Sequence, residues 1–232
     1  MNIHFKPARL KAALLAAAAL TCAACSTGSL FDSDVPVPTA YVIAPAPAGS
    51  ITDAPVTQVD LAIGRPDFAP GLDTDRIAVL DGRKLDYYRG VRWGGRSVEV
   101  VQSMLVSSIN DQQLFRSVTP EQARVANDYM LDVEVRHFEA DNANGKIPEV
   151  HVMIIGRLIR VADRRLVTTV SSAAIVAASA ERMSAVTAAF ESAAQKVALD
   201  LARQTAVAVS ADEPTLRKAR GEGNEARSSN AG

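Results

Sequence analysis

The most regular pattern in the chain is an alternation of apolar and charged residues from Asp128 to Phe138. One face of this segment carries Tyr129, Leu131, Val133 and Val135, and the other carries Asp128, Asp132, Glu134 and Arg136. Successive side chains of a strand point to opposite sides of the sheet, so the pattern predicts a strand with one buried face.

Shorter alternating or apolar runs predict further strands. The expected strands are residues 39–44, 57–63, 76–80, 84–88, 114–118, 150–161 and 166–177. Asp81 and Gly82 are a favoured turn pair and should join residues 76–80 and 84–88 in a hairpin. Residues 163–165 should form a tight turn, and residues 65–74, with two prolines and a glycine, a structured loop.

Two segments have the three-to-four-residue spacing of amphipathic helices. The apolar positions are Val98, Val101, Leu105 and Ile109 in the first, and Val186, Phe190, Val197 and Leu201 in the second. They predict helices over residues 97–112, with Ser97 as the N-cap, and over residues 184–207. The order of elements predicts an α+β fold in which two long helices pack on one face of a mostly antiparallel sheet.

The amino terminus has the pattern of an export signal. Three basic residues and no acidic one precede an apolar run, and residues 12–24 are 13 uncharged residues in a row. A bilayer-spanning helix needs about 20 such residues, so this is a signal peptide rather than an anchor helix. Two alanines followed by Cys25 resemble the lipobox of bacterial lipoproteins, in which the cysteine is acylated and becomes the new N-terminus. Cys22 fits less well, because leucine and threonine precede it, and a simple cleavable signal is the other interpretation.

The composition shifts along the chain and gives four parts. We expect a lipoprotein signal peptide at residues 1–24, a polar and proline-rich tether at residues 25–38, a folded domain at residues 39–209, and a disordered tail at residues 210–232.

Overall composition excludes several classes of protein. A chain of 232 residues that is 48% hydrophobic has enough apolar residues for one globular domain, and its eleven aromatics imply a core built mainly from aliphatic residues and alanine. The net charge of −1 falls to about −4 after cleavage before Cys25, which argues against a basic nucleic-acid binder. Cys22 is removed and Cys25 is acylated in this scheme, so the mature chain has no thiol nucleophile and no disulfide.

Motifs for catalysis are missing from the sequence, which has no G-x-S-x-G, no P-loop and no H-E-x-x-H. His137 and His151 are expected on neighbouring strands, with Glu134 nearby, but a metal site would need a third convergent ligand. We therefore expect no metal, no cofactor and no enzymatic activity. A periplasmic hydrolase would need a nucleophile or metal set that the sequence does not offer.

Five features in order resemble one known family. They are the Cys25 lipobox, residues 70–79 (PGLDTDRIAV), residues 85–88 (LDYY) leading to Arg92-Trp93, the strand ending Phe138-Glu139-Ala140, and the helix around Ala189-Phe190. Together they are similar to the ABC-type transport auxiliary lipoprotein (PqiC-like) family over about residues 39–208.

This resemblance implies a non-enzymatic accessory lipoprotein of an MCE-type ABC system that moves phospholipid or a related lipid across the Gram-negative envelope. Its implied partner is the periplasmic MCE-domain protein, around which several copies could form a ring. Ser26, rather than aspartate, follows the acylated cysteine, which resembles a signal for the periplasmic face of the outer membrane. An envelope-assembly or secretion adaptor unrelated to lipid transport is the alternative, because small α+β lipoprotein domains serve many partners.

The aromatic cluster is the candidate docking surface for that partner. Tyr87, Tyr88 and Trp93 lie within seven residues, and Arg76 precedes them in the motif. Interface cores prefer aromatic residues and arginine, although the same side chains could fill the core under the first helix. A basic hairpin made of Arg157, Arg160, Arg164 and Arg165 is a second candidate, which could face anionic lipid headgroups or only solvent.

Overall fold

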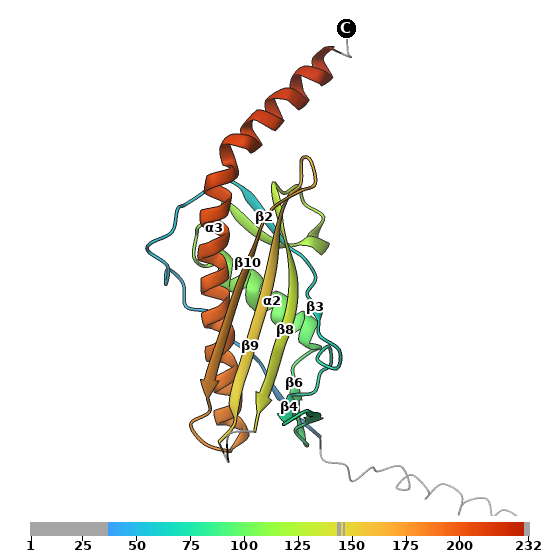
Figure 1. Ribbon diagram of the computed structural model, residues 1–232, viewed down its shortest axis with the longest axis vertical. Helices are drawn as coiled ribbons and strands as arrows, with labels where there is room; N and C mark the ends of the chain where they lie inside the picture. Colours follow the sequence, from blue (N-terminus) through green and yellow to red (C-terminus); the bar gives the residue numbers. More distant parts are fainter. Residues whose placement is uncertain (1–36, 143–144, 146, 230–232) are drawn as a thin grey trace, which may run out of the picture. The chain divides into compact units, whose positions relative to one another are not determined.

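The computed structural model describes residues 37–142, 145 and 147–229, and residues from Pro38 on form one unit (Figure 1). The predicted signal peptide, Cys25 and nearly all of the tether lie outside the described residues.

The strand with the clearest alternation becomes the centre of the sheet. β8 (Tyr129–Asp141) pairs antiparallel with β9 (Glu149–Arg160), which pairs antiparallel with β10 (Arg165–Ala177). The four residues predicted to point inward are at most 1% exposed. Both the half-buried strand and the long final hairpin are therefore confirmed.

Parallel pairing makes the sheet mixed. β2 (Asp60–Ile63) runs parallel to both β8 and β7 (Ser117–Pro120), and β3 (Asp67–Phe68) and β4 (Ala78–Asp81) also pair parallel to β8. Parallel neighbours need a long crossover, and the chain between β2 and β7 supplies it, including the first long helix. The three longest strands remain antiparallel, so the expectation of a mostly antiparallel sheet is confirmed in that sense.

Smaller elements differ from their predicted bounds. β4 pairs with β5 (Lys84–Tyr87) across Gly82-Arg83 rather than Asp81-Gly82, because Asp81 is itself paired with Lys84. β1 (Thr39–Tyr41) and β6 (Val91–Trp93) form a separate parallel pair, and the 3₁₀ helix η2 (Glu121–Ala123) precedes β8. β3, β6 and η2 have no counterpart among the predicted elements, because they are two or three residues long and have no periodicity to detect.

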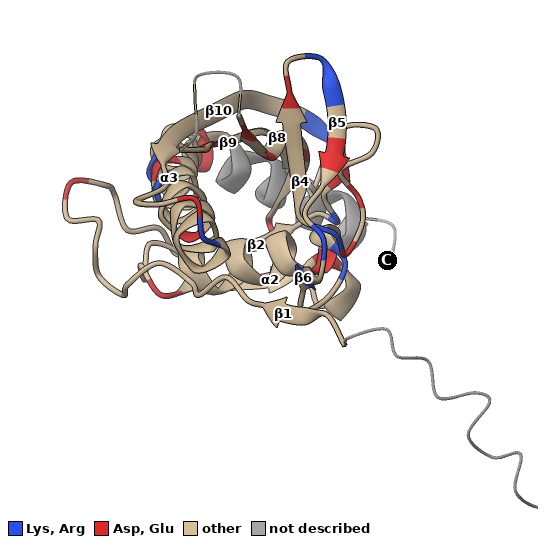
Figure 2. Ribbon diagram, turned by 90° about the horizontal axis from the view of Figure 1, so that it is seen from below, with Lys and Arg blue, Asp and Glu red and all other residues tan. Residues whose placement is uncertain are grey.

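Two helices lie on the same side of the β8–β9–β10 sheet, as predicted. Figure 2 shows α2 (Ser97–Asn110) and α3 (Met183–Ser229) below the three strands, and no helix above them. The N-cap of α2 is Arg96, not Ser97. The Ser97 hydroxyl instead donates to the carbonyl of Thr74, 2.7 Å away, and so fixes the preceding loop to the helix start.

α3 is longer than the helix predicted over residues 184–207. It continues to Ser229 with Pro214 inside it, so the segment predicted to be a disordered tail is helical as far as the described residues go. Tyr129 and Arg160 of the sheet donate to the Asp212 carboxylate. These bonds hold α3 against the sheet beyond residue 209, the predicted end of the folded domain.

The core lies between α3 and the inner face of the sheet. α3 contributes many alanines, among them Ala193, Ala194, Ala198 and Ala202, all fully buried. Small side chains let the helix approach the strands closely, and this accounts for a core with few aromatics. Gly156 of β9 also allows close packing, because a Cβ there would lie 2.7 Å from Leu131 Cδ1.

Candidate functional site

The motif loop at residues 70–76 is fixed to the corner where β6 meets α2. Arg96 forms an ion pair with Asp73 at 2.7 Å and also donates to the Asp73 carbonyl. The backbone N–H of Trp93 donates to the Asp75 carbonyl at 2.7 Å. The hydrogen bond that Arg96 donates to the Asp73 carboxylate is the main cause of a raised Arg96 pKa. These bonds hold the residue 70–79 motif against Trp93 of the next motif and against the start of α2.

Arg76 and Tyr87, two of the four predicted docking residues, are in contact. The Arg76 guanidinium carbon lies 4.0 Å from the centre of the Tyr87 ring, within the range of a cation–π interaction. The Tyr87 hydroxyl donates to the carbonyl of Gly71 at 2.8 Å. Gly71 has φ +86°, a conformation that favours glycine, and a Cβ there would lie 2.6 Å from Leu85 Cδ2. The pair is therefore held in place at the β4–β5 hairpin, with Arg76 exposed.

Trp93 is in the core rather than on a docking surface. It is 1% exposed, and its ring lies 5.1 Å from that of Phe190 and 5.5 Å from that of Phe138. Tyr88 is half-buried, and burial raises the pKa of its hydroxyl, which has no hydrogen-bond partner among the described residues. Of the predicted cluster, Trp93 is buried, Tyr87 and Tyr88 are both half-buried, and Arg76 is exposed.

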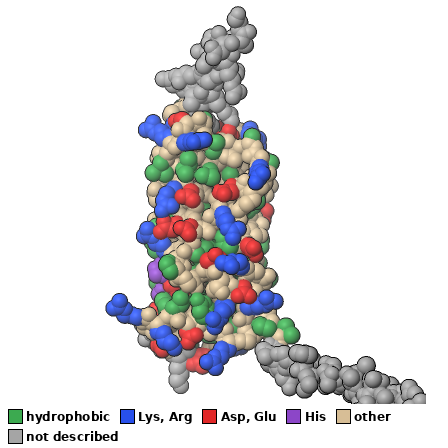
Figure 3. All heavy atoms as spheres, turned by 90° about the vertical axis from the view of Figure 1, so that its right-hand side faces the viewer, with side chains coloured by type: hydrophobic (Ala, Val, Ile, Leu, Met, Phe, Trp, Pro, Cys, Tyr) green, Lys and Arg blue, Asp and Glu red, His purple; other side chains and the backbone are tan. Residues whose placement is uncertain are grey.

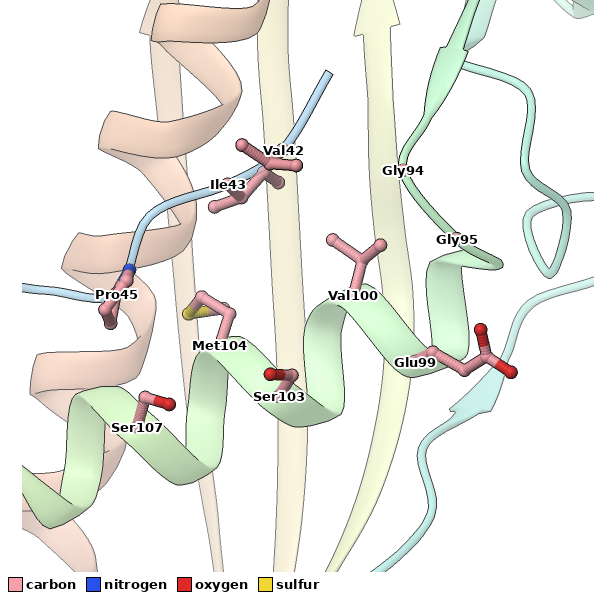
Figure 4. A pocket seen from close by; sticks show the side chains of 10 residues that line it. All are labelled: Val42, Ile43, Pro45, Gly94, Gly95, Glu99, Val100, Ser103, Met104 and Ser107. Carbon is pink, nitrogen blue, oxygen red and sulfur yellow. The ribbon is translucent and has the colours of Figure 1, made fainter. Parts of the chain in front are cut away.

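A groove of about 320 Å³ lies between α2 and the extended segment that follows β1 (Figure 4). Val42, Ile43 and Pro45 form one wall, and the outer face of α2 around Val100 and Met104 forms the other. The first wall is held rigidly: Glu191 of α3 accepts from the N–H of Ala44, and Gln195 donates to two carbonyls of the segment. No sequence pattern pointed to this groove, because its walls are distant in the chain.

An ion network around buried Arg160 joins α3 to the sheet, at the end where β8 begins and β9 ends. Arg160 is 1% exposed, and its guanidinium donates to Asp163 in the β9–β10 turn and to Asp212 of α3 at 2.8–3.0 Å. The Tyr129 hydroxyl donates to the same Asp212 at 2.8 Å. Burial and this hydrogen bond raise the pKa of Tyr129, and the hydrogen bond to Asp163 is the main cause of a raised Arg160 pKa.

The predicted basic hairpin is therefore mostly neutralised. Arg160 is buried in its network, and Arg157 is paired with Asp132 and Glu134 across β8 and β9. Only Arg164 and Arg165 remain as exposed basic residues of the four. On the face shown in Figure 3, basic and acidic side chains alternate along the domain. The arrangement resembles a solvated surface more than a site for anionic headgroups.

His137 and His151 are neighbours, as their strands predicted, with ring centres 6.5 Å apart. His137 Nδ1 lies 2.6 Å from the buried carboxylate of Glu139, which also accepts from the backbone N–H of Phe138. In the part of the chain that the structure describes, no three histidine, cysteine or acidic side chains are grouped so as to hold a metal ion. Over the same residues, no helix combines the length and apolarity needed to span a bilayer.

The described residues form an α+β domain with an Arg76–Tyr87 pair near the surface and a groove beside α2. The chain is a member of the ABC-type transport auxiliary lipoprotein component family, whose model matches residues 41–202. It is thus an auxiliary lipoprotein of an ABC-type transport system, a lipid-anchored protein of the cell envelope. The members of this family are transport auxiliaries and are not known as enzymes. No curated protein matches the chain.

Solved structures support the fold. Protein XCC0632 from Xanthomonas campestris, of family DUF330, is 24% identical with a TM-score of 0.70, over 76% of this chain and 99% of its own. An uncharacterized protein of known crystal structure is 11% identical with a TM-score of 0.57, over 73% of this chain and 99% of its own. A PelC dodecamer from Paraburkholderia phytofirmans, at 15% identity and a TM-score of 0.38 over 63% of this chain and 92% of its own, is too different to inform the assembly of this protein.

Proposed function

We propose that this protein is a non-enzymatic accessory subunit of an MCE-type ABC system that transports phospholipid or a related lipid across the Gram-negative envelope. It is acylated at Cys25, held at the periplasmic face of the outer membrane, and docks the periplasmic MCE-domain protein. The observation that carries this proposal is the family match, which covers residues 41–202 and so nearly the whole folded domain.

Two features of the sequence support the membrane assignment. Cys25 follows a short apolar run and two alanines, and Ser26 follows it rather than aspartate. One acyl chain binds a membrane only weakly, whereas several chains anchor a protein stably. Cys25→Ala should therefore leave uncleaved precursor or release the protein from the outer membrane, whereas Cys22→Ala should fractionate like the natural protein.

Docking calls for accessible anchor residues. Arg76 and Tyr87 satisfy this requirement, because the Arg76 guanidinium stacks on the Tyr87 ring and the Tyr87 hydroxyl is bonded to the carbonyl of Gly71. A partner that contacts the pair would not have to order flexible side chains first, which reduces the entropic cost of binding. A ring of several copies around the MCE protein is part of the same proposal.

Affinity purification of the tagged full chain from detergent-solubilised membranes tests the proposal. We expect the MCE-domain protein, with its permease and ATPase, to co-purify in fixed proportion, and the neighbouring genes to encode them. Recovery of secretion or peptidoglycan-anchoring proteins in their place would favour the adaptor function and refute ours.

A further inference from the structure

Among the described residues, no helix covers the outer face of the β8–β9–β10 sheet (Figure 1). One end of this face carries a row of apolar side chains. Met130, Ile159 and Leu166 lie side by side in a row across the three strands, since Ile159 is paired with both of the others. The Leu166 side chain is 53% exposed. In the next row along the strands, Asp132 and Arg157 form an ion pair, so the apolar row has a sharp polar boundary.

A hollow of about 630 Å³ opens beside Met130 and Ile159, and Leu166, the third residue of the row, lies at its margin next to Ile159. Met130, Ile159 and Val161 form its apolar lining, and Glu121, Asn127 and Arg164 complete it. Val161 is 40% exposed. Half-buried apolar side chains around a concave site, with a polar rim, are the usual form of a pocket that accepts an anchor residue of a partner.

The charges of the rim restrict what can occupy the hollow. Glu121 comes from η2 and Arg164 from the β9–β10 turn, so one negative and one positive side chain line the hollow from separate elements. A rim with both signs does not match a uniformly anionic membrane surface, which attracts basic residues only. It does match a protein segment with an apolar side chain between a basic and an acidic one, because opposite charges across an interface fix its orientation.

The position of the hollow is compatible with a protein partner. The chain enters the domain at Thr39, whose N–H donates to the carbonyl of Gly90 beside β6. The β4–β5 hairpin lies close by, and β4 pairs with the far end of β8, at Ala140 and Asp141. The hollow is at the other end of these strands, and β9, with 12 residues, spans about 40 Å. The site is thus remote from the point where the lipid tether joins the domain.

We propose that this hollow is a docking site for an apolar anchor residue of the transporter's periplasmic protein. The anchor lies on a segment that places a basic residue near Glu121 and an acidic residue near Arg164. This inference rests on the proposed function, and it adds a contact at the distal end of the domain to the Arg76–Tyr87 pair near the tether.

Leu166→Glu places a carboxylate next to Ile159 at the margin of the hollow and so tests the site, with Ile175→Glu as a matched control. Ile175 is also an outward residue of β10, 64% exposed, but it lies toward the other end of the strand. Both residues are exposed, so both variants should melt close to the natural protein. We expect Leu166→Glu to weaken binding of the purified periplasmic protein by tenfold or more, and Ile175→Glu to change it less than about twofold.

Photo-crosslinking gives an independent readout that does not depend on a charged variant. A photoreactive phenylalanine analogue at position 166 of the full chain should crosslink to the periplasmic protein in cells, and the same analogue at position 175 should not. Crosslinking of position 166 to a second copy of this chain or to lipid would overturn the proposal. Equal binding by both Glu variants, while the transporter still co-purifies, would overturn the site and leave the proposed function intact. If no transporter subunit co-purifies at all, both the docking site and the proposed function are wrong.

Discussion

Trp93, Phe138 and Phe190 contact one another where β6, β8 and α3 meet, with ring centres 5.1–5.5 Å apart. They join the small β1–β6 pair to the main core. Tyr87, only six residues before Trp93, is tied instead to Arg76 and Gly71 near the surface. Aromatic clustering in the sequence could not separate these two roles, because exposure depends on which distant elements cover each ring.

Alanine variants of Trp93 and Tyr87 should differ sharply in stability. Trp93→Ala removes a fully buried indole and should lower the free energy of unfolding by about 3–5 kcal/mol. Tyr87→Ala loses one hydrogen bond and one cation–π contact near the surface, so its cost should be about 1 kcal/mol. Urea denaturation measures both, and similar losses for the two variants would contradict the placement of Trp93 in the core.

Tyr129 should make the protein sensitive to alkaline pH. Burial, and then the hydrogen bond to Asp212, raise its pKa above the ordinary 10.0. The unfolded chain therefore releases this proton at lower pH than the folded chain does. The stabilisation is complete below pH 10 and is lost as the pH rises from there toward the folded pKa.

Tyr129→Phe isolates this effect. The free energy of unfolding of this variant should fall less steeply between about pH 9.5 and 11 than that of the natural protein, because phenylalanine at position 129 has no hydroxyl to ionise. Parallel curves for the two proteins over this range would show that Tyr129 is not held in its neutral form by the fold.

At the scale of elements, β8, β9, β10 and both long helices follow from local patterns, since each has many residues with one period. β2 and β7 were expected as strands, but their parallel pairing was not expected, because that pairing depends on the crossover through α2. The network of Arg160 and Asp212, 52 residues apart, has no local signal either. Periodicity indicates which face is buried and not what it is buried against.

Charge on the inner face of β8 should be far more harmful than a change on the outer face. Leu131 is fully buried beside Gly156, so Leu131→Asp should destabilise by several kcal/mol, because it places an unpaired carboxylate in the core. Asp132→Ala removes only a half-exposed pair with Arg157, worth up to about 1 kcal/mol. Thermal melting of the two variants measures this contrast, and equal shifts would mean that the inward face is assigned incorrectly.

The end of the folded domain should lie just after Asp212. A chain that stops at Glu213 keeps the pairs from Asp212 to Arg160 and Tyr129, and it should melt close to the full-length protein. Asp212→Ala in that shortened chain leaves buried Arg160 with Asp163 alone, which should cost about 2–4 kcal/mol. A shortened chain that is itself much less stable would show that residues beyond 213 contribute to the fold.

For the whole molecule, our proposal gives the lipid anchor, the Arg76–Tyr87 pair and the distal hollow one common role, which is attachment of this subunit to other components. The family could be recognised from five short motifs, of which the residue 70–79 loop proves to be hydrogen-bonded to Trp93 of the next motif. The distal hollow could not be found in this way. Its apolar row comes from three strands, and each strand contributes one residue that looks ordinary in the sequence.

Direct binding between the purified, acylated full chain and the transporter's MCE-domain protein tests the central claim. In detergent or nanodiscs at physiological salt, we predict saturable binding with a Kd of about 1 μM or tighter, as expected for a specific interface of ordinary size. The periplasmic protein of an unrelated envelope system should not bind. Absence of saturable binding to the MCE-domain protein at concentrations up to about 100 μM, weaker than a specific docking contact requires, would contradict the proposed function.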